Sequence, residues 1–267
     1  MFLFIHWNPD PNAFTTGFLS IQWYGVMWGL GLLSTFFIGT SIFRALKRDD
    51  EKLTILIQYM FVAGLLGARL AQVLFYELDY FVANPGKIIA VWEGGLASHG
   101  GVAGAIIGIL VFCKRHKDYS LFWSIDHAAI AVVLLASLIR FGNLMNSEIP
   151  GKETDVPWAF IFEKVDNVPR HPVVLYESVA YFFIQIFMLL LFVKYKDTKP
   201  GIYTIAFLLV VFTTRFLLEF FKEPEGSLIA GIISKTQLLN VPFIICGIVL
   251  LILFFNRKLS YNSVANG

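Results

Sequence analysis

The chain has 267 residues, of which 57% are hydrophobic and only 15% are charged, and its mean hydropathy is +0.69. Soluble domains usually carry about 25% charged residues, so this composition excludes an ordinary soluble domain and predicts an integral membrane protein. The formal net charge of +2 does not indicate a nucleic-acid partner, because the basic residues lie in short loops and form no single patch.

Apolar segments recur along the whole chain, and several approach or exceed the ~20 residues that cross a bilayer as a helix. Phe and Leu dominate them, and no alternation of period two persists. We expect an all-α integral membrane protein that is a single polytopic domain over residues 1–267. The predicted spans are roughly 19–43, 54–76, 95–113, 121–140, 173–193, 201–221 and 237–256.

The lysines and arginines of the connections predict the orientation, because cytoplasmic loops are enriched in them. One set of connections holds twelve basic residues and the other holds six, and the richer set also has the shorter loops. We therefore expect the amino terminus outside and the carboxyl terminus in the cytoplasm. The long outer loops would cover about 77–92, 141–172 and 222–236.

The first two predicted spans carry polar residues toward their outer ends. Tyr24 lies on the first span, and Arg69 follows Gly64 and Gly67 on the second. A charged residue inside a span costs at least about 2.5–3.5 kcal/mol on insertion scales, so Arg69 is a candidate functional residue. The alternative is one arginine that extends its side chain to water, above two glycines that let helices pack closely.

The third predicted span begins in a glycine-rich stretch that contains His99, Gly100 and Gly101. Each glycine costs about 1 kcal/mol relative to alanine inside a helix, so this cluster suggests that something approaches the backbone closely. We expect a site of lipid chemistry around His99, although an isolated histidine is more often structural. A metal site is not predicted, because the spans contain no pair of histidines at helical spacing.

The end of the fourth span offers one guanidinium, two amides and a carboxylate within nine residues, namely Arg140, Asn143, Asn146 and Glu148. A guanidinium presents a planar fork of donors that suits two phosphate oxygens. The alternative is that Arg140 extends to water at a helix end that Asn143 caps.

The fifth and sixth spans also carry polar residues on the outer side. His171, Tyr176 and Glu177 open the fifth span, while Arg215 and Glu219 lie four residues apart on the sixth. This spacing places the last two on one helix face. They would form either a simple ion pair or an arginine that Glu219 orients toward an anionic lipid.

These polar residues collect at one level, near the outer headgroup boundary, whereas the inner halves of the spans hold few. A conduction path would need polar lining through the whole membrane, so the pattern predicts an open-topped site. Arg69, Arg140 and Arg215 at a similar depth indicate an anion between them, with His99 facing it.

Four motifs in register resemble those of bacterial prolipoprotein diacylglyceryl transferases. They are His99-Gly100-Gly101, Arg140-x-Gly-Asn-x-x-Asn146-x-Glu148, Arg170-His171-Pro172-x-x-x-Tyr176-Glu177 and Arg215-x-x-x-Glu219-Phe-Phe-x-x-Pro224. The segments Trp23-Tyr24-Gly25 and Gly67-x-Arg69 are also similar, so the resemblance covers about residues 20–245. Two positions depart from the pattern: Ile139 stands where glycine is frequent, and Lys222 where arginine is common.

The resemblance implies an enzyme of the bacterial cytoplasmic membrane, with its site toward the outer leaflet and without a cofactor. It implies transfer of the diacylglyceryl group of phosphatidylglycerol to the lipobox cysteine in the signal peptide of a prolipoprotein, with release of glycerol 1-phosphate. His99, Arg140 and Arg215 would be catalytic. The expected substrate-binding residues are Tyr24, Arg69, Gly100, Gly101, Asn143, Asn146, Glu148, His171, Tyr176, Glu177 and Glu219.

Three other classes of protein compete with this hypothesis. An anionic-lipid transporter or flippase would use the same arginines, but it predicts repeat symmetry and broken helices at the midplane, and no repeat is evident. An intramembrane hydrolase needs a nucleophile near His99, where Ser98 is the only adjoining serine. A non-enzymatic scaffold would not require three arginines at one depth.

Overall fold

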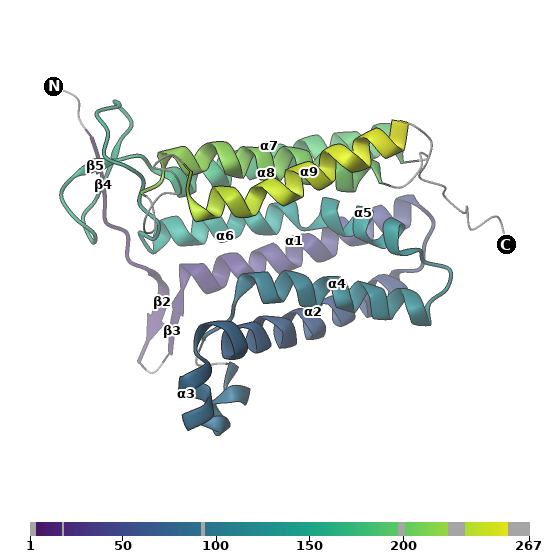
Figure 1. The fold of residues 1–267 in the computed structure, drawn as a ribbon. Coiled ribbons are helices and arrows are strands. Elements are labelled where there is room, and N and C mark those ends of the chain that lie inside the picture. The colour runs from purple at the N-terminus through teal and green to yellow at the C-terminus, as the bar shows by residue number, and fades with distance from the viewer. Residues whose placement is uncertain (1–3, 18, 92–93, 197–200, 224–232, 256–267) are drawn as a thin grey trace. The chain divides into compact units, whose positions relative to one another are not determined.

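The computed structural model describes residues 4–17, 19–91, 94–196, 201–223 and 233–255, which are mostly helical (Figure 1). The chain divides into two compact units. Of the described residues, the first unit comprises those in 1–38 and 128–255, and the second comprises those in 39–127. Two helices, α1 (Trp23–Ala45) and α5 (Leu121–Ala131), each begin in one unit and end in the other.

Among the described residues, six helices are long and apolar enough to cross a membrane, and they confirm six of the expected spans. They are Trp23–Ala45, Asp50–Tyr76, Leu121–Met145, Val173–Tyr195, Ile202–Phe221 and Lys235–Phe255. The third of these runs beyond the predicted end at residue 140, so Arg140 lies more than one turn inside a helix and not at its terminus.

The predicted span at 95–113 forms the helix α4 (Ser98–Arg115), but this helix is not among the six. Four glycines in its 18 residues and two basic residues in its last turn reduce its apolar content. The structure therefore bears out the helix, while its passage through the membrane stays a prediction.

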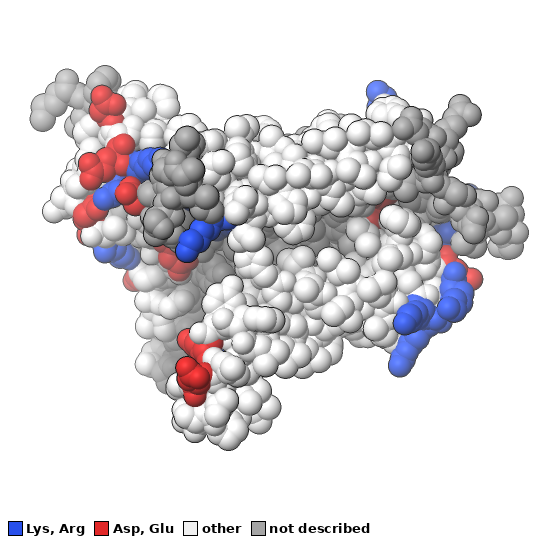
Figure 2. All heavy atoms as spheres, viewed as in Figure 1, with Lys and Arg blue, Asp and Glu red and all other residues white. Residues whose placement is uncertain are grey.

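Four long helices form most of the first unit: α6 (Val133–Met145), α7 (Val173–Tyr195), α8 (Ile202–Leu218) and α9 (Lys235–Phe255). Helix α7 packs against both α6 and α8, and α9 packs against α8 (Figure 1). Ser137 and Ser178 tie α6 to α7, because each hydroxyl donates to the backbone carbonyl of the other serine, at 2.7 and 3.0 Å. Charged side chains visible on this unit gather over the β4–β5 segment, whereas the sides of its helices are largely free of them (Figure 2).

The span Leu121–Met145 is interrupted at Val132, where α5 ends and α6 begins. The side chain of Gln185 on α7 compensates for the interruption, since its Oε1 accepts a 2.9 Å hydrogen bond from the backbone N–H of Leu134. A buried backbone donor without a partner costs free energy comparable to a lost hydrogen bond. Gln185 therefore stabilises the break that sets the direction of α6.

The expectation of an all-α fold is wrong in one respect, because the described residues of the first unit include five short strands. A three-stranded sheet joins β1 (Ile5–Trp7), β4 (Phe160–Phe162) and β5 (Pro169–Arg170), and a hairpin joins β2 (Asn12–Thr16) and β3 (Leu19–Gln22). The sheet packs on a small core of Leu144, Phe160, Phe162 and Val174. This core fixes the long segment after α6 to the ends of α6 and α7.

The second unit is organised around the close packing of α2 (Asp50–Ala71) against α4. A Cβ atom on Gly104 would lie 2.1 Å from the carbonyl oxygen of Ala63, and one on Gly100 would lie 2.3 Å from that of Gly67. Such approaches are possible only without side chains. The structure thus identifies α2 as the close neighbour that the glycine cluster near His99 predicted.

The carboxyl-terminal end of α2 continues into one π-helical turn, η1 (Gln72–Tyr76). Two short helices follow, α3 (Leu78–Ala83) and η2 (Pro85–Ile89). Of the predicted outer loops, 77–92 is described except for Trp92, whereas 224–232 of the loop 222–236 lies outside the described residues.

Candidate functional site

A buried carboxylate lies at the centre of the polar residues of the first unit. Glu177, on the first turns of α7, is fully buried and contacts two cations: Arg140 Nε lies 2.9 Å from its Oε2, and Lys222 Nζ lies 2.8 Å from its Oε1. Lys222 is 7% exposed. Because a charge inside a protein must be paired, each of these side chains fixes the position of the others.

The ionic contacts continue from Lys222 toward α9. The ammonium of Lys222 also lies 3.2 Å from Oε2 of Glu219, in the short helix η4 (Glu219–Phe221). Glu219 in turn accepts a 3.1 Å hydrogen bond from the hydroxyl of Ser234, which also accepts from the backbone N–H of Gln237. Two carboxylates and two cations therefore alternate between α6, α7 and η4, and a hydroxyl ends the series at α9.

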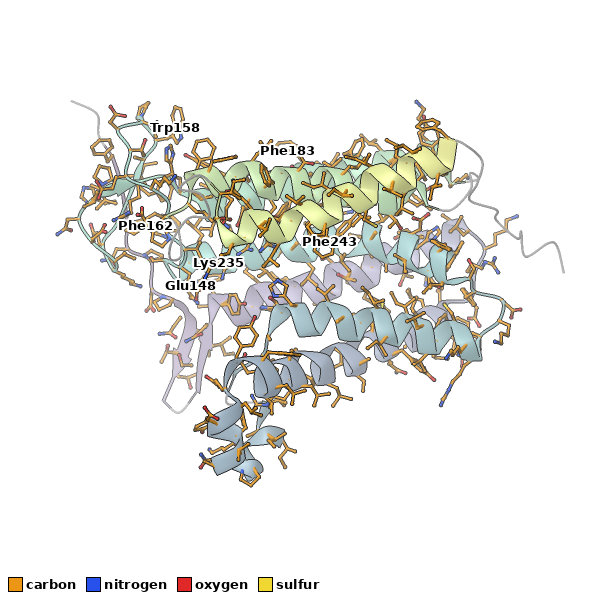
Figure 3. All side chains as sticks on the ribbon, in the orientation of Figure 1. Glu148, Trp158, Phe162, Phe183, Lys235 and Phe243 are labelled. Carbon is orange, nitrogen blue, oxygen red and sulfur yellow. The ribbon has the colours of Figure 1, made fainter. Side chains whose placement is uncertain are left out.

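On the side away from Glu177, Arg140 contacts residues at the carboxyl-terminal end of α6. Its NH1 donates to Asn143 Oδ1 at 3.3 Å, and the amide groups of Asn143 and Asn146 donate to the carboxylate of Glu148, at 2.5 and 3.0 Å. Glu148 thus orients Arg140 through Asn143, and the direct contact with Arg140 is made by Glu177. In Figure 3, Glu148 and Lys235 mark the end of the first unit where these side chains gather.

Tyr24 lies beside the same segment. A Cβ atom on Gly142 would be 3.1 Å from both Cα and Cδ2 of Tyr24, so α1 and α6 approach closely at this glycine. The motif glycine between Arg140 and Asn143 therefore places Tyr24 next to the polar residues at the end of α6.

Arg215 joins this region from α8. Within the described part of the chain it forms no ion pair with Glu219, which pairs with Lys222 instead, and its buried Nε has no hydrogen-bond partner. Tyr181, one turn beyond Glu177 on α7, interacts electrostatically with Glu177, Arg215, Arg140 and Glu219. All four charged groups therefore act on one buried phenol, and among the described residues Arg215 has no ion-pair or hydrogen-bond partner.

A short backbone ladder holds Lys222 in place. Gly151 pairs with Lys222 as an antiparallel bridge and donates its N–H to the carbonyl of His171 at 3.1 Å. A Cβ atom on Gly151 would lie 2.4 Å from that carbonyl oxygen, so only glycine fits. Gly151 is not among the residues predicted from the sequence, where Lys222 stands only as a departure from a motif. Their roles depend on pairing between distant segments, which no local pattern signals.

The outward face of this ladder is aromatic. Trp158 Nε1 donates to the hydroxyl of Tyr176 at 2.7 Å, and that hydroxyl lies 3.3 Å from Nδ1 of His171. Burial lowers the pKa of His171 below its ordinary 6.5, so at pH 7 the ring is neutral and its Nδ1 can accept a hydrogen bond from the hydroxyl of Tyr176. Tyr176 and His171 therefore lie beside the ionic residues without joining them.

Arg170 fastens the loop beneath this aromatic face. It pairs with Asp166 at 2.7 Å, lies 3.6 Å from Glu223, and donates to the carbonyl of Gly151 at 3.2 Å. Its hydrogen bond lowers the pKa of Asp166 below 3.8, and the same contact raises the pKa of Arg170. The ion pairs of Arg170 thus help to fix the position of the ladder.

The remaining predicted residues lie in the second unit. Arg69 uses its five N–H groups on backbone carbonyls of one loop, at 2.5 to 3.2 Å, from Lys87, Ile88, Ala90, Gly94 and Gly95. It also lies over the ring of Phe81, 4.9 Å from its centroid. These contacts brace the loop and leave Arg69 no donor for a phosphate.

His99 occupies the first turn of α4 and is exposed. It has no hydrogen-bond partner among the described residues, so the imidazole is available to a ligand. Helix α2 occupies the space that a side chain at Gly100 would need. A Cβ atom on Gly101 would make only ordinary contacts, with its nearest neighbour at 3.5 Å.

The described part of the first unit therefore presents two arginines with donors to spare, and the buried Glu177 holds one of them, Arg140. Arg140 makes two contacts through its five N–H groups, and Arg215 has a buried donor without a described partner. Preorganised cations of this kind stabilise negative charge that develops on a phosphate or carboxylate. In the described residues no three His, Cys, Asp or Glu side chains gather as metal ligands.

Comparison with known proteins shows the family of the chain. The family profile of prolipoprotein diacylglyceryl transferase matches residues 11–253. The chain is 42% identical to the phosphatidylglycerol–prolipoprotein diacylglyceryl transferase of Tolumonas auensis, over 95% of this chain and 99% of that protein. It is also 42% identical to the protein of the same name from Chloroherpeton thalassium, over 93% of each. The chain is a multi-pass membrane protein that belongs to the prolipoprotein diacylglyceryl transferase family.

Proposed function

We propose that this transferase moves the diacylglyceryl group of phosphatidylglycerol to the lipobox cysteine of a prolipoprotein. The sulfur forms a bond to the terminal glyceryl carbon, the carbon–oxygen bond to the phosphate breaks, and glycerol 1-phosphate leaves with the bonding electrons. The observation that carries the proposal is the pair Arg140 and Arg215, with donors left free beside the buried Glu177.

The arginines act on the leaving group. Negative charge grows on the phosphate as its bond to carbon breaks, and cations already held in place stabilise that charge without reorganising. Glu177 orients Arg140, and Asn143 with Glu148 fixes its other side. Asn146 and Tyr24 lie at the same helix end and supply polar contacts for the glycerol headgroup. Glu219 acts through Lys222, so it is a positioning residue.

The cysteine needs a base, because a thiol of pKa about 8.5 reacts as its thiolate. His99 is proposed for this role, since its imidazole is exposed and without a described partner at the start of α4. For Arg69, the contacts favour bracing over substrate binding. His171 and Tyr176 would contact the substrate from the outward aromatic face.

The proposed topology has seven spans, with α4 as the seventh, the amino terminus outside and the carboxyl terminus in the cytoplasm. One support is the close packing of α4 along α2, which is long and apolar enough to span a membrane. The other is the excess of lysine and arginine in one set of connections. The protein would reside in the bacterial cytoplasmic membrane with its site at the outer leaflet, where both substrates arrive by lateral diffusion.

The test uses purified protein, phosphatidylglycerol and a lipobox peptide, read by mass spectrometry. We expect the peptide to gain one diacylglyceryl mass, and Arg140→Ala to lower kcat/KM by more than a hundredfold, as the loss of a transition-state charge contact does. His99→Gln should abolish most turnover across pH 6 to 9. No mass gain with wild-type protein, or a loss under tenfold for Arg140→Ala, would overturn the proposal. Lipid translocation without thioether product would favour a flippase.

A further inference from the structure

Helices α8 and α9 run antiparallel, and two contacts fix their register. Gln237 Nε2 donates to the carbonyl of Phe216 at 3.2 Å. The rings of Phe212 and Phe243 stack at 4.3 Å with an interplanar angle of 12°, and Phe243 is labelled in Figure 3. Residue 237 of α9 therefore lies level with residue 216 of α8, and residue 243 lies level with residue 212. Asn240 lies between these two levels.

Two buried donors without partners lie at this level. They are Nε of Arg215 and Nδ2 of Asn240, and neither meets an acceptor in the described ranges. Asn240 is only 4% exposed. Gln237, one turn earlier on α9, differs, because its amide both donates to Phe216 and accepts from Ser234.

An unsatisfied buried donor in a native protein requires an explanation. Both groups are donors, so a ligand that satisfies them offers oxygen acceptors. Their charges differ, however: Arg215 is a cation and suits a phosphate, whereas Asn240 is neutral and suits a carbonyl. One ligand with both kinds of oxygen, a short distance apart, fits this pair of side chains.

The depth of Asn240 identifies the carbonyl. Helix α9 begins at Lys235, near Ser234 and the ionic residues, and five residues correspond to a rise of about 7.5 Å. In a glycerophospholipid the acyl ester carbonyls lie just below the phosphate, toward the hydrocarbon. A phosphate near the start of α9, at the level of Ser234 and Glu219, would therefore place an ester at the level of Asn240.

We propose that Asn240 is a lipid-binding residue that donates a hydrogen bond to an acyl ester carbonyl of the diacylglyceryl group. This inference rests on the proposed function and deepens it, because it assigns recognition of the transferred group to α9 and recognition of the leaving group to the arginines. The ester remains on the product, so Asn240 distinguishes diester lipids from diether lipids that lack the carbonyl.

The experiment compares dipalmitoyl phosphatidylglycerol with its di-O-hexadecyl ether analogue, in mixed micelles with a lipobox peptide. One hydrogen bond changes an equilibrium or rate by about threefold to tenfold, so the wild-type protein should prefer the diester by that factor in kcat/KM. Asn240→Leu should lose this factor with the diester and keep its rate with the diether, which brings the ratio close to one. Asn240→Ser, which retains a donor, should preserve part of the preference.

The matched control is Gln185→Leu, which removes another buried amide from the same unit at the break between α5 and α6. It should lower thermal stability and leave the diester-to-diether ratio unchanged. A wild-type ratio near one, or an unchanged ratio in Asn240→Leu, overturns the inference while thioether still forms. Absence of thioether with the wild-type protein and the diester refutes the proposed function instead. If Asn240→Leu does not fold, the wild-type and Asn240→Ser ratios decide.

Discussion

Glu177 is the residue whose replacement should reveal most about the site. Glu177→Gln keeps the shape of the side chain but removes the charge between Arg140 and Lys222, which lie 2.9 and 2.8 Å away. The amide oxygen of glutamine can accept a hydrogen bond from one of the two cations. Its NH₂ group is a donor and would then face the donors of the other cation. Breaking a buried ion pair by removing one partner costs about 3–5 kcal/mol, and with Glu177 fully buried we expect a loss of that size.

The assay is equilibrium unfolding in mixed detergent micelles, followed by tryptophan fluorescence. Glu177→Gln should lose about 3–5 kcal/mol, and its transferase rate should fall because Arg140 is no longer oriented. Adding Lys222→Met restores the charge balance, so the double variant should recover part of the loss, with a coupling of about 0.5–3 kcal/mol.

The control is Glu163→Gln, which alters a carboxylate on the surface. Glu163 pairs with His6 at 2.9 Å, and its side chain is 36% exposed. Exposed pairs contribute about 0–1 kcal/mol, so this variant should behave almost like the wild-type protein. If Glu177→Gln were equally mild, or if its effect and that of Lys222→Met simply added, the ionic residues would not act as one unit.

The structure supports three further predictions. Arg69→Lys supplies three donors for five carbonyls, so amide hydrogen exchange in residues 87–95 should accelerate while α7 stays protected. Gly104→Ala should lower the melting temperature by several degrees because its Cβ would overlap the α2 backbone, whereas Gly29→Ala, with no atom within 4 Å of the added Cβ, should not. Asp166 has a depressed pKa, so its contribution to stability is present above pH 3.8 and is lost as the pH falls through the folded-state value. Asp166→Asn should remove that acid-side slope from a plot of melting temperature against pH.

Much of the fold could be read from the sequence, because a lipid environment leaves few choices. A helix satisfies its own backbone in a bilayer, so apolar length alone indicated the spans, and six are confirmed. The glycine cluster likewise indicated a close backbone approach. Its neighbour, helix α2, could not be named, because pairing between helices depends on shape across the interface.

The candidate site was predicted as a set of residues but not as a set of contacts. Helical spacing suggested that Glu219 holds Arg215, yet Glu219 contacts Lys222, and Arg140 is held by Glu177. Periodicity reports which residues share a helix face, whereas an ion pair depends on which helix end lies opposite.

The sequence by itself therefore determined the membrane class, the positions of most helices and the chemical groups that the site can use. The tertiary structure decided which arginines keep free donors: Arg69 gives all of its N–H groups to one loop, while Arg215 retains one in a buried place. The physical reason is that a guanidinium is costly in the membrane wherever it lies. The cost can be offset by the protein's own carbonyls or by a ligand, and only the folded chain shows which of the two is present.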